Sequence, residues 1–251
     1  METALPIIFF GLLGFALLTY AILDGYDLGI GMLLPLGSDS EKDMMIATIG
    51  PFWDANETWI VLGVGILLIA FPQAHGRILT ALYLPVTIML FGLILRGVAF
   101  DFRVKAGIDK KERWNRAFFI GSLVASVSQG WMLGAYITGL QGGMINLLYS
   151  GLIALLLPAF YVYLGSTWLL IKTEDVLFDK ALKWSRLAIF PTAAALLLIS
   201  IATPLVSESI AARWFTLPNA IGLMPIPISC GLIFMGMVWL VNKPRCYQAG
   251  L

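Results

Sequence analysis

Seven long apolar stretches constrain this chain more than any other feature of its sequence. They cover residues 6–36, 52–71, 78–100, 117–138, 146–171, 187–206 and 219–241. A helix needs about 20 apolar residues to cross a bilayer, so each stretch is long enough. Only 12% of the residues are charged, against about a quarter in a soluble domain. Because the stretches lack the alternation of barrel strands, the sequence predicts an all-α, polytopic membrane protein with about seven spans.

The N-terminus and the overall composition exclude several other classes. The stretch METALPIIFFGLLGFALL has no basic segment and no small-residue cleavage site before its apolar run. We therefore expect a retained first span and not a removed signal peptide. The two cysteines, Cys230 and Cys246, do not make a disulfide framework. The net charge of +1 indicates no polyanionic partner, so nucleic acid is not expected.

The distribution of basic residues predicts the orientation. Of the 16 lysines and arginines, thirteen fall in the loops after the first, third and fifth spans and in the tail. The opposite loops hold only Arg77 and Arg213, and Arg96 lies inside the third span. Because cytoplasmic loops carry the excess of Lys and Arg, we expect the N-terminus outside and the C-terminus in the cytoplasm. We also expect two bundles, a four-helix bundle over 1–138 and an incomplete three-span bundle over 139–251.

Acidic residues interrupt the cytoplasmic halves of the first two spans. Asp24 and Asp27 lie in AILDGYDLGIGMLL, and Asp54 and Glu57 lie in GPFWDANETWIV. Each pair is three residues apart, which places its members on one helix face. Asp54 and Glu57 also fall in the first turns of their span, where acids stabilise a helix dipole. That simple explanation does not fit Asp24, which is more than two turns from the charged loop.

The third span adds Arg96 and Asp101 at the same predicted depth, and Asn56 lies beside the acids of the second span. A charge at the bilayer centre costs at least about 2.5–3.5 kcal/mol. The acids therefore need an internal partner, a wet interior or a bound proton. Acids of unequal proton affinity can pass protons, so one interpretation is a proton path from the cytoplasm. The other is structural: Arg96 pairs with an acid, a cofactor propionate or another subunit.

The glycines around the first acid pair have two explanations. Gly25, Gly29 and Gly31 could allow close helix packing, or they could mark a broken helix that offers backbone groups to an ion. Cofactor motifs are absent from the sequence, with no Walker loop, GxGxxG, HExxH or CxxC. One histidine, His75, lies in the predicted outer loop FPQAHGR, and a lone histidine cannot ligate several haems. We expect no metal site and no cofactor chemistry in this chain alone.

Three of these stretches resemble subunit II of the cytochrome bd family of quinol oxidases. AILDGYDLGIGMLL, IGPFWDANETWIV and LRGVAFDFRVK match its motifs D-G-[FY]-D-x-G-x-G, W-D-x-N-[EQ]-x-W and R-x-x-x-[FY]-[DE]-[FY]-R in the family's order. LGSTWLLIKTED and RWFTLPNAIGL are similar to its cyanide-insensitive branch. The resemblance covers nearly the whole chain. The positions that match the family's motifs are Asp24, Asp27, Trp53, Asp54, Arg96, Asp101 and Arg103.

The resemblance implies a place in a prokaryotic cell membrane complex that oxidises quinol and reduces oxygen to water. Subunit I of such complexes carries haem b, haem d and the quinol site, whereas subunit II carries no haem and contributes a proton route. Family members continue for one or two further spans, and this chain departs from them in ending after the seventh. A truncated product, a split subunit and a short variant all fit that departure.

Two alternatives to the oxidase subunit stay open. Buried acids on glycine-rich helices are typical of proton- or cation-coupled transporters. A transporter built from repeats should show a second acidic pair, but the last three predicted spans hold no Asp or Glu before Glu208. The second alternative is a subunit of the same complex whose acids only pair with Arg96 and with the partner.

Overall fold

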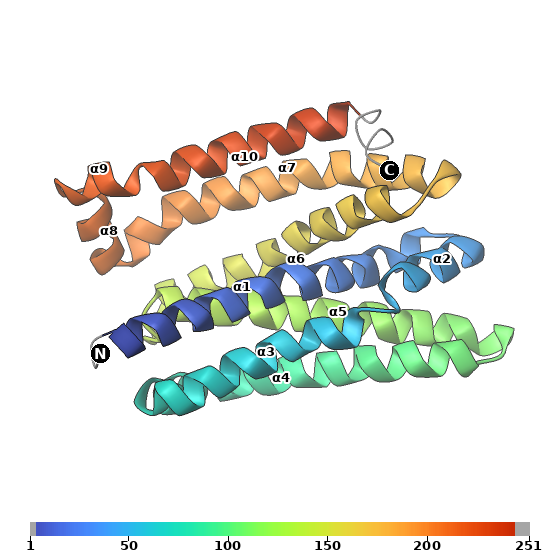
Figure 1. Ribbon diagram of the computed structural model, residues 1–251, viewed down its shortest axis with the longest axis horizontal. Helices are drawn as coiled ribbons and strands as arrows, with labels where there is room; N and C mark the ends of the chain where they lie inside the picture. The colour runs from blue at the N-terminus through green and yellow to red at the C-terminus, as the bar shows by residue number, and fades with distance from the viewer. Residues whose placement is uncertain (1–3, 244–251) are drawn as a thin grey trace. The chain divides into compact units, whose positions relative to one another are not determined.

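The computed structural model describes residues 4–243, and the regular secondary structure in this part of the chain is entirely helical (Figure 1). Cys246 and Arg245, one of the basic residues of the tail, lie outside the described residues. The helices are α1 (Ala4–Leu33), the 3-10 turn η1 (Leu34–Leu36), α2 (Asp39–Ile49), α3 (Trp53–Ala70), α4 (Pro72–Lys105), α5 (Ile108–Ile137), α6 (Met144–Lys172), α7 (Asp175–Val206), α8 (Glu208–Trp214), α9 (Asn219–Leu223) and α10 (Pro225–Asn242).

Seven segments of the described chain are long and apolar enough to cross a membrane. They correspond one to one with the seven predicted stretches, so the predicted all-α, seven-span class is confirmed. Several helices extend beyond the apolar stretch that predicts them. α4 begins at Pro72 and not at residue 78, because proline is well suited to the first turn of a helix. His75 therefore lies in the first turns of α4, and its predicted place in a loop is wrong.

The loop expected after the first span contains a helix, α2. Ser38 begins it with a capping box, in which the Ser38 backbone N–H donates to Glu41 Oε2 at 2.7 Å. This reciprocal cap satisfies backbone donors that the first turn leaves unpaired. Met45, Ile46 and Ile49 of α2 are buried, so the helix packs on the protein.

The chain forms two compact units, residues 1–129 and 130–251, with the boundary inside α5. In the first unit α1 packs against α3, and Figure 1 shows α4 returning antiparallel to α3 after the turn at Phe71. α1 is helical without a break through Gly25, Gly29 and Gly31. A side chain at Gly31 would overlap Ser122 of α5. Close packing therefore explains Gly31, and the broken-helix alternative is wrong.

α4 and α5 approach most closely at Gly92 and Gly121. A β-carbon at Gly121 would lie 2.6 Å from the Gly92 carbonyl oxygen and 2.8 Å from the backbone nitrogen of Arg96. Only a residue without a β-carbon allows backbones to meet at this distance. The contact therefore fixes α4 against α5 at the level of Arg96.

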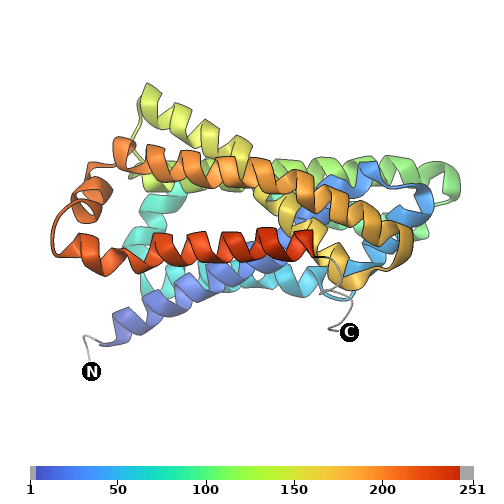
Figure 2. The same ribbon diagram turned by 90° about the horizontal axis from the view of Figure 1, so that it is seen from above.

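The second unit is centred on the pair α6 and α7. Ser185 donates a hydrogen bond to Ser166 at 2.9 Å, and the hydroxyls of Tyr149 and Thr203 lie 2.6 Å apart. These bonds join the two helices in their interior, as side-chain hydroxyls commonly do between membrane helices. Figure 2 shows how α8 and α9 connect the end of α7 to α10, which contacts α7 near Val241, whose carbonyl accepts from Arg186 at 3.4 Å. The division into a four-helix and a three-helix bundle stays a prediction.

Candidate buried acidic site

A single arginine joins the acids of α1 and α3. Arg96 of α4 is completely buried, and its Nη2 lies 2.6 Å from Asp24 Oδ1 of α1. Both side chains are 1% exposed. The same Nη2 also forms an ion pair and hydrogen bond with Glu57 Oε1 of α3, whose side chain is 25% exposed. One guanidinium therefore compensates two carboxylates that come from separate helices.

Asp27 lies about one turn after Asp24 in α1, and its hydrogen-bond partner is a neutral side chain. Its residue is 2% exposed, and Asn56 Nδ2 of α3 donates to Asp27 Oδ2 at 2.9 Å. Asp24 and Asp27 thus share one face of α1, as their spacing predicts. Three carboxyl groups and one guanidinium thus meet in this site.

Some polar atoms of the site make no hydrogen bond to any described residue. They are both carboxylate oxygens of Asp24, Arg96 Nε and Arg96 Nη1, all of them buried, and of these only Asp24 Oδ1 is in an ion pair, with Arg96 Nη2. Most buried polar atoms in proteins are hydrogen-bonded, and exceptions concentrate at functional sites. Arg96 thus keeps two donor groups, and Asp24 one acceptor oxygen, that no bond to a described residue uses.

The structure places the other predicted acids outside this site. Asp54 and Asp101 are exposed, although Asp54 is only three residues from Glu57. Residues three apart on a helix differ by about 60° in direction. The rotation of α3 that turns Glu57 towards Arg96 therefore leaves Asp54 on the outer side.

Aromatic side chains separate the buried acids from the end of α4. Trp53 packs on Phe100 with ring centroids 5.0 Å apart, and Phe100 packs on Phe118 at 6.3 Å. Arg96, Phe100 and Arg103 follow one another at successive turns of α4, and about 10 Å of helix separates the two arginines. Trp53 is therefore part of an apolar layer between two polar groups.

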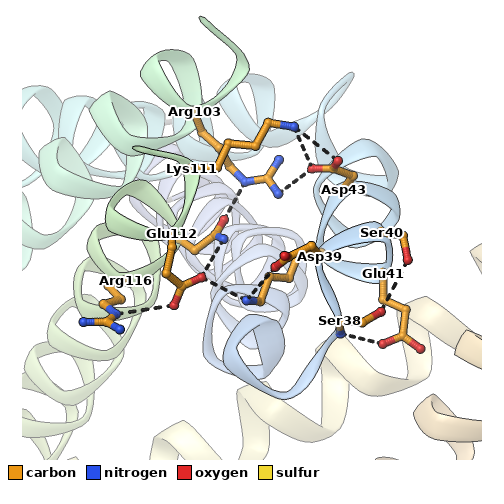
Figure 3. Close-up of polar contacts among 11 residues, drawn as sticks. Ser38, Asp39, Ser40, Glu41, Asp43, Arg103, Lys111, Glu112 and Arg116 are labelled. Carbon is orange, nitrogen blue, oxygen red and sulfur yellow. Dashed lines mark hydrogen bonds and ion pairs between the residues drawn. The ribbon is translucent and has the colours of Figure 1, made fainter. Parts of the chain in front are cut away.

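Arg103 belongs to a second, peripheral network that ties α2 to α4 and α5 (Figure 3). Its Nε donates to Asn115 Oδ1 and its Nη2 to Asp43 Oδ1, both at 2.6 Å. Lys42 of α2 donates to Glu112 Oε2 of α5 at 2.9 Å. Three ion pairs, Lys42–Glu112, Arg103–Asp43 and Lys111–Asp43, thus hold α2 against the end of the α4–α5 hairpin.

The charge state of Asp43 depends on this network. Partial burial raises the pKa of the Asp43 carboxyl, but hydrogen bonds and positive charge from Arg103 and Lys111 outweigh it and hold the pKa below its ordinary value of 3.8. Asp43 is therefore ionised in the folded protein near neutral pH.

The described residues contain no group of acidic, cysteine or histidine side chains suited to a metal ion. No three His, Cys, Asp or Glu side chains among residues 4–243 are grouped so that they could hold a metal ion. His75, the one histidine, lies in the first turns of α4 and belongs to neither polar group.

The sequence matches the model of the family described as cytochrome bd terminal oxidase subunit II over residues 5–250. The chain belongs to this family. It is 41% identical over 128 residues to the cytochrome bd ubiquinol oxidase subunit 2 of Bacillus subtilis (strain 168), a match of 50% of this chain and 37% of the relative. It is 32% identical over 160 residues to the cytochrome bd-I ubiquinol oxidase subunit 2 of Escherichia coli (strain K12), covering 61% and 42%.

A third relative gives a longer match. The probable cytochrome oxidase subunit 2 of Haemophilus influenzae is 28% identical over 204 residues, or 74% of this chain and 53% of the relative. The chain thus spans about half or less of the length of these curated relatives.

Six of the motif residues of this subunit II chain lie in the two polar groups, whereas Asp54 and Asp101 are exposed and Trp53 lies in the apolar layer. The buried site holds Asp24, Asp27, Asn56, Glu57 and Arg96, and the peripheral network holds Arg103. Sequence reasoning missed the partners of Arg103, namely Asp43 and Asn115. Both look like ordinary members of charged loops, and no local pattern predicts a contact across 60 residues, as between Asp43 and Arg103.

Proposed function

We propose that this chain is the non-haem membrane subunit of a quinol:oxygen oxidoreductase of the respiratory chain. Family membership and the printed names of the Bacillus and Escherichia relatives support the reaction. The partner in this proposal is subunit I, which carries haem b, haem d and the quinol site. In this proposal the chain itself carries no haem and acts by supporting the partner and by moving protons. The complex would reside in a prokaryotic cell membrane.

We further propose that the buried acids form a proton route from the cytoplasm towards the partner. The supporting observation is the pair of carboxylates, Asp24 and Asp27, held on one buried face of α1 by Arg96 and Asn56. Asp27 can accept a proton because its hydrogen bond is to a neutral amide. Arg96 forms the ion pair with Asp24 and keeps other donor groups for water. Glu57, partly exposed, would exchange protons with the outside of the site.

The proposed orientation in the membrane and the proposed branch of the family rest on the sequence alone. The excess of basic residues supports a cytoplasmic position for the site and an external N-terminus. The stretches LGSTWLLIKTED and RWFTLPNAIGL support the cyanide-insensitive branch of the family.

The transporter alternative has less support. A coupled transporter built from repeats would place acids inside both of its halves. Between residues 130 and 243 the acids are exposed without exception, namely Glu174, Asp175, Asp179 and Glu208. The buried polar residues of the second unit are hydroxyl side chains.

The test is oxidase activity per haem for Asp27→Asn and Asp24→Asn in the complex purified through a tag on this chain. A proton route predicts a loss of at least about tenfold in oxygen consumption with a ubiquinol analogue, with haem content unchanged. Asp179→Asn, an exposed acid of the second unit, is the matched control and should keep full activity. Asp27→Asn is the more informative variant because an amide can retain the contact with Asn56.

Two outcomes would reject the proton route. Full activity of Asp27→Asn would exclude Asp27 as a proton carrier. Loss of haem and of subunit I together with activity would assign the acids a structural role in assembly.

A further inference from the structure

The outer face of α4 carries an apolar stripe that ends in a cation. Phe91, Ile94, Val98 and Phe102 recur at spacings of three and four residues, so they lie along one side of the helix. They are 67, 60, 40 and 55% exposed, respectively. Lys105, the next residue of the stripe, is exposed at the end of α4.

The neighbouring helix α5 carries apolar, aromatic and cationic side chains in the same order. Ile120 is an exposed apolar side chain. Trp114 stacks on Phe102 with ring centroids 5.2 Å apart and an interplanar angle of 27°. Lys110, one turn before Trp114, and Arg113, its neighbour in sequence, are exposed in the first turns of α5. The two helices therefore form a surface that changes from apolar to aromatic to cationic.

The cations of this hairpin fall into two groups. Arg103, Lys111 and Arg116 pair with carboxylates of the peripheral network, as Figure 3 shows. Lys105, Lys110 and Arg113 form no ion pair with a described residue, and we call these three the hairpin cations. Their charges are free for an external anion.

We propose that the hairpin cations bind the phosphate of an anionic phospholipid. The acyl chains would lie along the stripe from Phe91 to Val98, and the Phe102–Trp114 pair would lie at the level of the glycerol. Tryptophan prefers this interfacial level of a membrane, and basic residues next to spans attract anionic headgroups. The order of the three zones on the protein matches the order of the three parts of a phospholipid.

The occupant is a lipid and not a partner protein, for two reasons on this face. The apolar stripe lies on α4, a helix that has the length and composition to span the bilayer. The cations are at its end, where a lipid phosphate would lie beside acyl chains in contact with the stripe. A protein interface would instead favour a buried apolar centre depleted of charge.

The test measures which lipids stay bound to the full chain with its co-purifying subunits. The detergent-solubilised protein is equilibrated with phosphatidylcholine and phosphatidylglycerol in equal amounts, and retained lipids are counted by native mass spectrometry. The variant K105Q/K110Q/R113Q should lower the retained ratio of phosphatidylglycerol to phosphatidylcholine by at least about tenfold, since each basic residue near an anionic surface contributes about fivefold. D109N, which removes an exposed acid from the same hairpin, should raise the ratio.

The control variant R77Q/K172Q/K183Q removes three exposed cations outside the hairpin and should change the ratio less than about twofold. Four results would overturn the proposal. The hairpin variant could keep the wild-type ratio, or the control variant could lower it equally, which would indicate general surface charge. Inorganic phosphate could displace phosphatidylglycerol at equal concentration, which would indicate a site for free anions. Loss of a subunit from the hairpin variant with the lipid ratio unchanged would make this face a protein interface.

Discussion

Replacing Arg96 by methionine should destabilise the protein more than any other single change in the buried site. Methionine keeps a long side chain but leaves the 1% exposed carboxylate of Asp24 and that of Glu57 without a cation. Breaking a buried ion pair by removing one partner costs about 3–5 kcal/mol. We therefore expect the free energy of unfolding of Arg96→Met to fall by about that amount.

The companion change separates ion pairing from packing. Asp24→Asn alone leaves Arg96 paired with Glu57, so we expect a smaller loss of about 1–3 kcal/mol. In the double variant R96M/D24N, the asparagine no longer needs a cation. Its free energy of unfolding should therefore exceed that of Arg96→Met, with a coupling energy of about 2–3 kcal/mol between the two sites.

The assay is unfolding in mixed micelles by titration with dodecyl sulfate, followed by tryptophan fluorescence. The control is the exposed pair Lys111–Asp43, whose charged atoms are 3.2 Å apart. Its cycle of K111M and D43N should give a coupling of about 0–1 kcal/mol, as exposed pairs do. Losses that add within about 0.5 kcal/mol in R96M/D24N would refute a direct interaction between Arg96 and Asp24.

Two further changes test the packing and the peripheral network. Gly121→Ala should lower the free energy of unfolding by about 1–3 kcal/mol, because its β-carbon would meet the α4 backbone at 2.6 Å; Gly11→Ala, with nothing within 4 Å, should be neutral or stabilising by up to about 1 kcal/mol. Equal effects of the two would contradict the close approach of α4 and α5. The lowered pKa of Asp43 contributes stability that is full above its ordinary pKa of 3.8 and is lost as the pH falls below that value. Asp43→Asn should therefore flatten the loss of unfolding free energy on acidification, and an unchanged acid profile would contradict the contacts with Arg103 and Lys111.

The seven spans could be predicted because hydropathy depends on composition along the chain and not on partners. The common level of Asp24 and Arg96 could be predicted as well, since helices that cross a bilayer of fixed thickness bring such positions to similar depths. Sequence left open what Arg96 pairs with, and the structure gives Asp24 and Glu57 as its partners.

The directions of side chains and the pairing of residues far apart in the chain could not be predicted from the sequence. The spacing of Asp54 and Glu57 gives their separation on α3 but not the rotation of α3 about its axis. That rotation depends on packing with α1 and α4. α2 was missed because its charged sequence has no apolar stretch long enough to indicate a helix, although its capping box is visible at Ser38 and Glu41. Its place is set by ion pairs with residues some 70 positions away.

The most direct measurement is a visible redox difference spectrum of the material that purifies through a tag on this chain. The proposed role as the non-haem subunit predicts that the partner brings the chromophores. We therefore expect reduced-minus-oxidised bands of both haem b and haem d in the purified complex. A preparation that contains the chain in full amount but no haem would contradict the proposed role as an oxidase subunit.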